Sequence, residues 1–277
     1  MKAIALILLF TTVTFTSYCQ SLNYQWSTDT LFLKPESAAY DHKRSIAYIS
    51  NVNGEFLARD GNGFVSRIKL NGEIEELKWV RGLDNPQGLG LYKNSLYVAD
   101  IDKIVKIDVM KGEIEKVLKI DGAVFLNDVS IDKNGDVYVS DCRTNKIHRI
   151  VHDKVETWLT DPLLAIPNGL LVEEESVYIL NMQNGIVYTA DKITKKLTQF
   201  STGIKDCDGM VSDGKGGYFV SGAWQGTIYH LDSKGEKKLV LDLSKEKVIT
   251  ADIEYVAEEK LLLIPTLDKR VLGYKRE

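Results

Sequence analysis

The chain has 277 residues, of which 35 are Lys or Arg and 39 are Asp or Glu, so its formal net charge is −4. This length suits one large domain or two small ones. Because the charges nearly balance and no basic stripe is visible, we do not expect nucleic acid to be a partner.

Residues 1–19 have the composition of a secretory signal peptide. Lys2 supplies the charged start, Ala3–Phe10 is a continuous apolar run, and Ser17 and Cys19 form a small-x-small cleavage pattern. The apolar run is too short to span a bilayer comfortably. We therefore expect export to the periplasm or outside the cell, with no stable membrane insertion after processing. An uncleaved anchor and a lipidated Cys19 are the alternatives.

One local pattern then recurs six times along the chain. In each copy a polar residue opens a short apolar strand, and a turn and a second apolar strand follow. The six polar residues are Glu36, Gln87, Asn127, Asn168, Asp208 and Asp252. A β-patterned repeat of about forty residues is typical of propeller blades, and single blades cannot bury their own faces. The sequence predicts one all-β domain over residues 20–277, a six-bladed β-propeller.

Two further strands follow the pair in most copies. In the first copy they are residues 64–70 and 73–80, joined by the hairpin signal Asn71-Gly72. The sixth copy supplies residues 270–275 and then the chain ends. Because an open ring would leave a sheet edge exposed, we expect residues 24–33 to provide the missing outer strand of the last blade.

The connection Asn51–Gly63 in the first copy is longer than its counterparts and rich in glycine. In a propeller the first strand leaves the ligand face and the second returns to it, so we expect this loop to overhang the six polar residues. It is either a lid over the site or a solvated hairpin loop.

The first strands of propeller blades line the central channel, so the six polar side chains are expected to meet there. Three of them are carboxylates, Glu36, Asp208 and Asp252, with no cation at an equivalent position. Such a cluster must protonate or bind a cation. Mixed carboxylate and amide oxygens suit calcium, whereas zinc prefers His or Cys, and no histidine opens a blade. The alternative is that these residues merely start strands and turns.

A second set of polar residues ends the second strands, on the same face. Its members are Asn51, Asp100, Asp141, Asn181 and Ser221. They either orient the metal ligands and contact substrate, or cap the edges of the strands. We expect Trp224 and Tyr92 to be packing residues and His148 to lie on the surface.

At these residues the sequence resembles the superfamily of regucalcin, gluconolactonase and luciferin-regenerating enzyme, and more distantly the diisopropylfluorophosphatase and paraoxonase propellers. The matching motifs are PESAAYD, LNDVSID, PNGLLV and CDGMVSD. The resemblance implies that Glu36, Asn168 and Asp208 bind a metal ion, that Asn127 is a ligand or a substrate contact, and that Asp208 is the catalytic carboxylate. Gly209 would let the backbone turn tightly beside the ion.

One departure concerns the substrate. Sugar lactonases of this superfamily carry an Arg two residues before the blade-three Asn, and Phe125 stands there in this chain. The residues expected to contact substrate or to support the metal ligands are Gln87, Asp252, Phe125, Asp100, Asp141 and Asn181. We expect a monomeric, calcium-dependent hydrolase of lactones or related small-molecule esters. The alternative is a non-enzymatic propeller that binds a ligand or a protein and carries a structural calcium ion.

Overall fold

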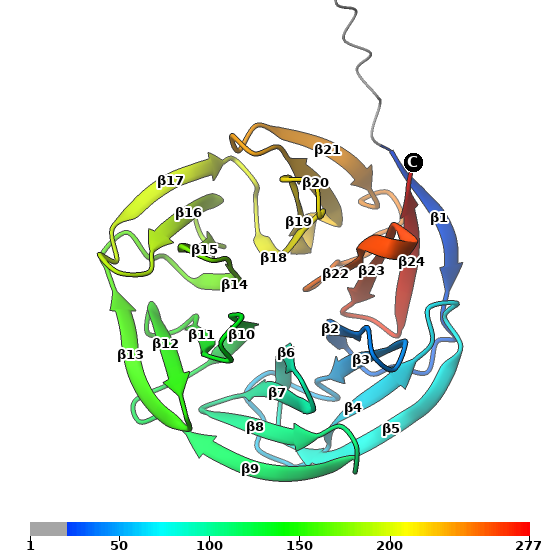
Figure 1. Ribbon diagram of the computed structural model, residues 1–277. Coiled ribbons are helices and arrows are strands. Elements are labelled where there is room, and N and C mark those ends of the chain that lie inside the picture. Colours follow the sequence, from blue (N-terminus) through cyan, green and yellow to red (C-terminus); the bar gives the residue numbers. More distant parts are fainter. Residues whose placement is uncertain (1–20) are drawn as a thin grey trace, which may run out of the picture.

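The computed structural model describes residues 21–277. They form 24 strands in six four-stranded antiparallel sheets around a central axis (Figure 1). This is the all-β, six-bladed propeller that the repeat predicts. The signal peptide expected at residues 1–19 lies outside the described residues.

In blades one to five the strands run outward from the axis in chain order. Blade one consists of β2 (Pro35–Asp41), β3 (Ile46–Asn51), β4 (Gly63–Ile68) and β5 (Ile74–Leu83). Blade two consists of β6 (Pro86–Tyr92), β7 (Ser95–Asp100), β8 (Lys103–Asp108) and β9 (Glu113–Lys119). Blade three consists of β10 (Leu126–Ile131), β11 (Val137–Asp141), β12 (Lys146–Val151) and β13 (Lys154–Thr160).

The second half of the chain repeats this arrangement. Blade four consists of β14 (Pro167–Val172), β15 (Ser176–Asn181), β16 (Ile186–Asp191) and β17 (Leu197–Thr202). Blade five consists of β18 (Cys207–Ser212), β19 (Tyr218–Gly222), β20 (Thr227–Leu231) and β21 (Lys237–Asp242). Blade six consists of β22 (Glu254–Val256), β23 (Leu261–Thr266), β24 (Arg270–Arg276) and β1 (Leu22–Ser27). Two 3₁₀ turns, η1 (Ala223–Gln225) and η2 (Ala257–Glu259), connect strands of blades five and six. Within residues 21–277 no helix is long and apolar enough to cross a membrane.

The N-terminal strand closes the ring. β1 pairs antiparallel with β24, beginning with Leu22 opposite Arg276. Closure by an N-terminal strand is therefore confirmed. The strand is shorter than the expected range 24–33, because the chain leaves the strand geometry after Ser27, although the Phe32 amide still donates to a carbonyl of the β23–β24 turn at 3.1 Å.

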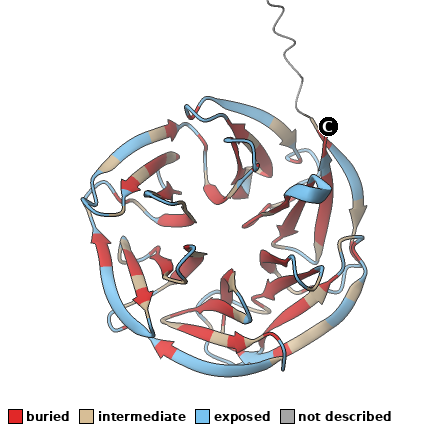
Figure 2. Ribbon diagram, viewed as in Figure 1, coloured by how far each residue is buried: buried red, intermediate tan, exposed pale blue. Residues whose placement is uncertain are grey.

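The inner strands are buried and the outermost strands are exposed (Figure 2). β3, with the sequence IAYISN, is buried at every position, whereas most residues of β9, with the sequence EIEKVLK, are exposed. A continuous apolar run suits a strand that packs on both faces. The core accordingly lies between neighbouring blades, where Tyr48 of blade one and Val98 of blade two belong to one apolar cluster.

Glycine follows the polar opening residue in blades two, four and five because neighbouring first strands nearly touch at the axis. A Cβ atom on Gly169 would lie 1.8 Å from the Asp208 carbonyl oxygen, and one on Gly209 would lie 2.3 Å from Asp252 Oδ1. Neither glycine has a positive φ. The tight turn expected at Gly209 is therefore wrong, and its role is to give the next blade room.

Candidate metal centre and active site

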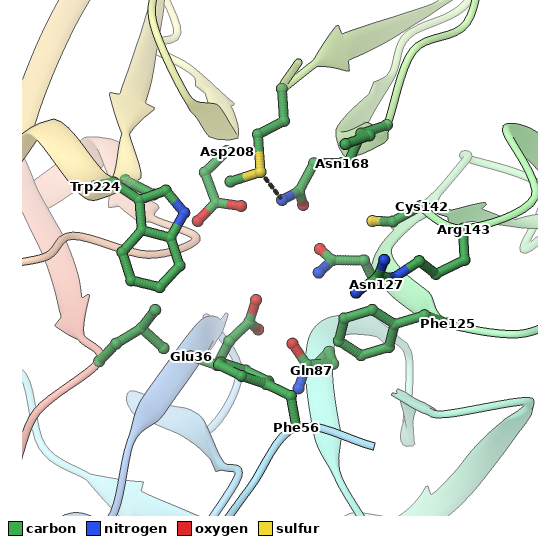
Figure 3. Close-up of a pocket in the computed structure, with 14 residues that line it drawn as sticks. Glu36, Phe56, Gln87, Phe125, Asn127, Cys142, Arg143, Asn168, Asp208 and Trp224 are labelled. Atoms are coloured by element: carbon green, nitrogen blue, oxygen red, sulfur yellow. Dashed lines mark hydrogen bonds between the residues drawn. The ribbon is translucent and has the colours of Figure 1, made fainter.

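Five of the six predicted polar residues meet at one end of the channel. Each is the second residue of a first strand, in β2, β6, β10, β14 and β18. Their side chains line a cavity of about 310 Å³ (Figure 3). The five residues are Glu36, Gln87, Asn127, Asn168 and Asp208. The shared position within the blade explains why residues from five separate repeats converge there.

Asp252 lies outside this cavity because blade six is shifted by one residue. In blade one the first residue pair between the two inner strands is Pro35 with Asn51, and in blade six the isolated bridge between Thr250 and Thr266 takes its place. Ala251, one residue after the bridge, therefore corresponds to Glu36. Asp252 lines a second cavity of about 380 Å³ further along the channel. A shift of one residue reverses which way a strand side chain points. The ring therefore has five polar members, and Ala251 stands where a sixth was expected.

Two oxygen atoms of the ring are buried without a hydrogen-bond partner. They are Glu36 Oε2 and Asn168 Oδ1. The amide nitrogen of Asn168 faces Met182 Sδ at 3.6 Å, so its oxygen is left toward the cavity. Gln87 donates to Asn85 Oδ1 at 3.0 Å and turns its carbonyl oxygen inward (Figure 3). Buried acceptors without donors are costly, and a hard cation is the partner that such oxygens suit.

The carboxylates of the ring have strongly raised proton affinities. Burial, reinforced by the charge of Asp128, raises the pKa of Asp208 to about 7. Burial also raises the pKa of Glu36 well above its usual value, with further contributions from Asp208, Asp252 and Asp128. Charges that cannot be solvated or paired must bind a proton or a cation. The electrostatics and the unpartnered oxygens thus point to the same requirement.

Asp128 belongs to this acidic environment although the sequence reasoning missed it. Burial raises its pKa to about 6. Its carboxylate accepts the Leu170 amide at 2.6 Å and so links blade three to blade four. Asn127 next to it lines the cavity, because a shift of register between Leu126 and Val129 breaks the alternation of the strand. An acid directly after a ring residue is the signal that could have identified it.

The donor set decides which metal fits. Within residues 21–277, no group of three or more His, Cys, Asp or Glu side chains is arranged to hold a metal ion. A metal here would depend on two carboxylates, Glu36 and Asp208, together with the amide oxygens of Asn127 and Asn168. This all-oxygen set fits calcium better than zinc.

The acidic residues at the ends of the second strands form hydrogen bonds with the loops that precede the first strands. Asp100 accepts the amides of Asp84 and Asn85 at 3.1 and 2.5 Å. Asp141 accepts the amides of Val124 and Phe125 at 3.0 and 3.1 Å. These loops lead into the strands that carry Gln87 and Asn127, so the acids fix the approach of those strands. Direct hydrogen bonds from the strand ends to the loops match the capping alternative.

Two more of the polar residues at the ends of the second strands also form hydrogen bonds with nearby loops, and a third does not. Asn51 Oδ1 accepts the Leu33 amide at 3.1 Å, and Asn181 donates to the Leu163 carbonyl at 2.7 Å. Ser221 is one residue out of register, because Gly222 pairs with the start of β18. Its hydroxyl instead accepts the Gly209 amide at 2.8 Å.

The wall of the cavity is apolar and partly aromatic. Phe56 and Phe125 pack edge to face with ring centroids 6.3 Å apart. Phe56 comes from the long loop 51–63, so the expected overhang is confirmed. Trp224, in η1, lines the opposite side and is 52% exposed, so the expectation of a packing residue is wrong (Figure 3). Ile166, Met182, Ala223 and Leu267 complete the apolar lining.

Outside the cavity, the expectation for Tyr92 is confirmed and the one for His148 is wrong. Tyr92 packs against the backbone of Gly135, as expected of a packing residue. His148 is only 2% exposed, so the surface position expected for it is wrong; the ring sits inside blade three, 3.9 Å from Asp141. Cys142 and Cys207 are free cysteines, and both are buried.

Three solved structures have a similar fold. A gluconolactonase from Xanthomonas campestris matches with a TM-score of 0.72 and 14% identity over 92% of this chain and 88% of that chain. Virginiamycin B lyase from Staphylococcus aureus matches with a TM-score of 0.67 and 11% identity over 92% and 99%. A chain of a nidogen/laminin complex matches with a TM-score of 0.67 and 16% identity over 79% and 83%. These low identities establish the propeller fold, which serves several functions.

The sequence comparison is more specific. No curated protein matches the chain. The family model of the SMP-30/gluconolactonase/LRE-like region matches residues 82–252, well over half of the chain, including four of the five ring residues. The chain therefore belongs to the SMP-30/gluconolactonase/LRE-like family.

Proposed function

We propose that the chain is a calcium-dependent hydrolase of lactones or related esters, acting in the five-residue cavity. The observation that carries the proposal is the pair of buried acceptor atoms, Glu36 Oε2 and Asn168 Oδ1, that lack a hydrogen-bond donor beside Asp208. Family membership supports the lactone class of substrate. The proposal includes a small-molecule substrate, a monomeric protein and export from the cytoplasm.

The residues have distinct roles in this proposal. Glu36, Asn127, Asn168 and Asp208 would hold the ion. When bound, calcium would polarise the substrate carbonyl and stabilise negative charge on its oxygen. Asp208 accepts a proton from water as the water oxygen bonds to the acyl carbon. The acyl–oxygen bond then breaks, and the proton passes to the leaving alkoxide, which gives the hydroxy acid.

The cavity supports this chemistry in two ways. Burial of Asp208 raises its affinity for a proton, which a general base requires. The apolar walls from Phe56, Phe125 and Trp224 exclude water from the sides of a bound substrate and strengthen electrostatic interactions inside. Gln87 is the fifth residue of the ring, and its side-chain carbonyl oxygen can accept a hydrogen bond from the attacking water.

The test combines calcium binding with turnover. Calorimetric titration measures calcium affinity, and a panel of lactones and aryl esters is assayed with calcium and after chelation. We expect hydrolysis that chelation abolishes and calcium restores. A ligand present at a hundred times its dissociation constant stabilises the fold by about 2.7 kcal/mol, so chelation should also lower the melting temperature. Calcium binding without hydrolysis of any panel member would favour the binding propeller with a structural ion.

A further inference from the structure

Arg143 is the only cationic side chain among the residues that line the described cavity. It lies in the turn between β11 and β12, where its amide donates to Asp141 Oδ1 at 3.1 Å. This hydrogen bond fixes the backbone of Arg143 in the turn, whereas the side chain of Arg143 is exposed.

The guanidinium of Arg143 lacks a partner within the part of the chain that the structure describes. The other seven arginines of residues 21–277 each make a hydrogen bond or an ion pair through the guanidinium. They are Arg44, Arg59, Arg67, Arg81, Arg149, Arg270 and Arg276. An arginine is thus left unpaired at the one cavity where a ligand is expected.

The charges of the cavity are separated by depth. Glu36 and Asp208 are each 4% exposed and lie at the floor, whereas Arg143 is at the solvent-exposed rim. Figure 3 shows its side chain on the same side as Phe125, across the cavity from Trp224. A molecule whose reacting carbonyl lies at the floor would pass between these aromatic walls and reach the guanidinium with its other end.

The chemistry of such a site favours one kind of ligand. Burial of an apolar body against aromatic walls is favourable. A neutral ligand that covered Arg143, however, would desolvate the guanidinium without forming an interaction that compensates for the lost water. An anionic group instead forms a charge-assisted, two-pronged hydrogen bond with a guanidinium. Carboxylate, sulfate and phosphate share this chemistry.

We propose that Arg143 determines specificity by selecting ligands with an apolar body and an anionic group at the end remote from the floor of the cavity. The identification of these ligands as substrates rests on the proposed hydrolase function. A polyhydroxylated, neutral sugar lactone matches neither the wall nor the rim.

A pair of fluorescent probes tests the binding step without turnover. 8-Anilinonaphthalene-1-sulfonate and N-phenyl-1-naphthylamine share one apolar body, and only the first carries a sulfonate. In the calcium-loaded protein, Arg143→Gln should weaken sulfonate binding about tenfold, the loss expected for one charge-assisted hydrogen bond. The affinity for the neutral probe should stay unchanged.

Two further variants control for position and for packing. Arg81→Gln removes a guanidinium that bonds the Lys78 carbonyl on the outer strand of blade one, and it should leave both affinities unchanged. Trp224→Ala removes the aromatic side chain that lies across the cavity from Phe125, and it should weaken the binding of both probes. The proposal is overturned if Arg143→Gln leaves sulfonate affinity within twofold of wild type, or weakens both probes equally.

A hydrolytic comparison separates specificity from function. The substrates are mono-4-nitrophenyl adipate, which is anionic, and 4-nitrophenyl hexanoate, which is neutral. The ratio of their kcat/KM values should fall about tenfold in Arg143→Gln, mainly through KM. An unchanged ratio with continued hydrolysis would overturn the role of Arg143 and leave the hydrolase intact. Absence of hydrolysis together with Arg143-dependent sulfonate binding would overturn the hydrolase and leave the ligand preference intact.

Discussion

The hydroxyl of Ser37 donates a hydrogen bond to Asp252 Oδ2 at 2.6 Å, across the seam where blade six meets blade one. The same hydroxyl accepts the Leu89 amide of blade two at 3.2 Å. One side chain thus links three blades, directly after the ring residue Glu36. The register of three blades and the position of Glu36, the proposed metal ligand, are therefore coupled at this point of the ring.

Ser37→Ala should destabilise the protein by about 1–3 kcal/mol, because it leaves the buried Asp252 carboxylate and the Leu89 amide without a partner. Denaturant unfolding measures the difference. Ser212→Ala is the matched control, since that exposed hydroxyl accepts the Gly214 amide, and it should change the free energy of unfolding by less than about 0.5 kcal/mol. Equal unfolding midpoints for the two variants would contradict the linking role.

Asp208 and Asp252 should respond differently to the same substitution. Asp208→Asn removes the proposed base and a charge beside the ion, so turnover should vanish and calcium affinity should fall. Asp252→Asn should retain calcium, because its carboxylate bonds to Ser37 outside the cavity, and should lose about 10–100-fold in activity.

Calcium titration and initial rates on the best panel substrate make this comparison. Asp232→Asn is the control, since Asp232 is exposed and accepts amides of its own turn. Full activity of Asp208→Asn would end the proposed mechanism. Equal and mild losses in the Asp208 and Asp252 variants would show that neither carboxylate is the base.

The carboxylate of Asp213 should make the free energy of unfolding depend on pH in the acidic range. Burial alone would raise the pKa of its carboxyl, but hydrogen bonds from His230, the Lys215 and Gly217 amides, and Arg276 outweigh burial and hold it well below its usual range. A lowered folded-state pKa contributes stability that is present above the unfolded value, near 4, and is lost as pH falls toward the folded value.

Asp213→Asn should cost about 3–5 kcal/mol at pH 7, since it leaves the buried Arg276 charge without its carboxylate. Unfolding of the variant and the wild type should be compared at pH 7 and pH 3, and the gap should narrow at pH 3. A gap that widens in acid would show that the carboxylate is not stabilised as the hydrogen bonds indicate.

Shortening the loop 51–63 to a tight turn should alter KM or substrate range and leave calcium affinity unchanged. The loop contributes Phe56 to the cavity wall and none of the ring oxygens. Phe56→Ala is the milder companion and should change KM in the same direction. Unfolding of the shortened protein would assign the loop a structural role instead.

The repeat predicted the fold and five ring residues because both depend on local patterns that recur along the chain. The pattern predicts a ring position for Asp252 because the segment DIEYVAEEKLLLIP, which it opens, resembles the other copies of the repeat. The Thr250–Thr266 bridge, a contact between distant residues, instead puts Ala251 there. Which way a strand side chain points depends on such pairing, and spacing alone cannot supply it.

Trp224 and Arg143 were missed for a different reason. Both lie in short connections between strands, where side-chain direction follows from turn geometry and from neighbouring blades rather than from periodicity. Only the folded ring shows that these connections from blades five and three face one cavity. The five ring residues, Phe125 and the overhanging loop 51–63 could be inferred from the sequence, whereas the positions of Trp224 and Arg143 in the cavity lining could not.

The pairing of β1 with β24 also sets the order in which the protein can be completed. A ribosome makes residues 22–27 before the other strands of the propeller and residues 270–276 after them, so the ring stays open until all six blades have been synthesised. Bringing these two strands together closes a loop that contains all the other strands, which makes it a slow, non-local step. A product that stops before residue 270 has an unpaired first strand and an exposed sheet edge, which quality-control proteases and chaperones can recognise.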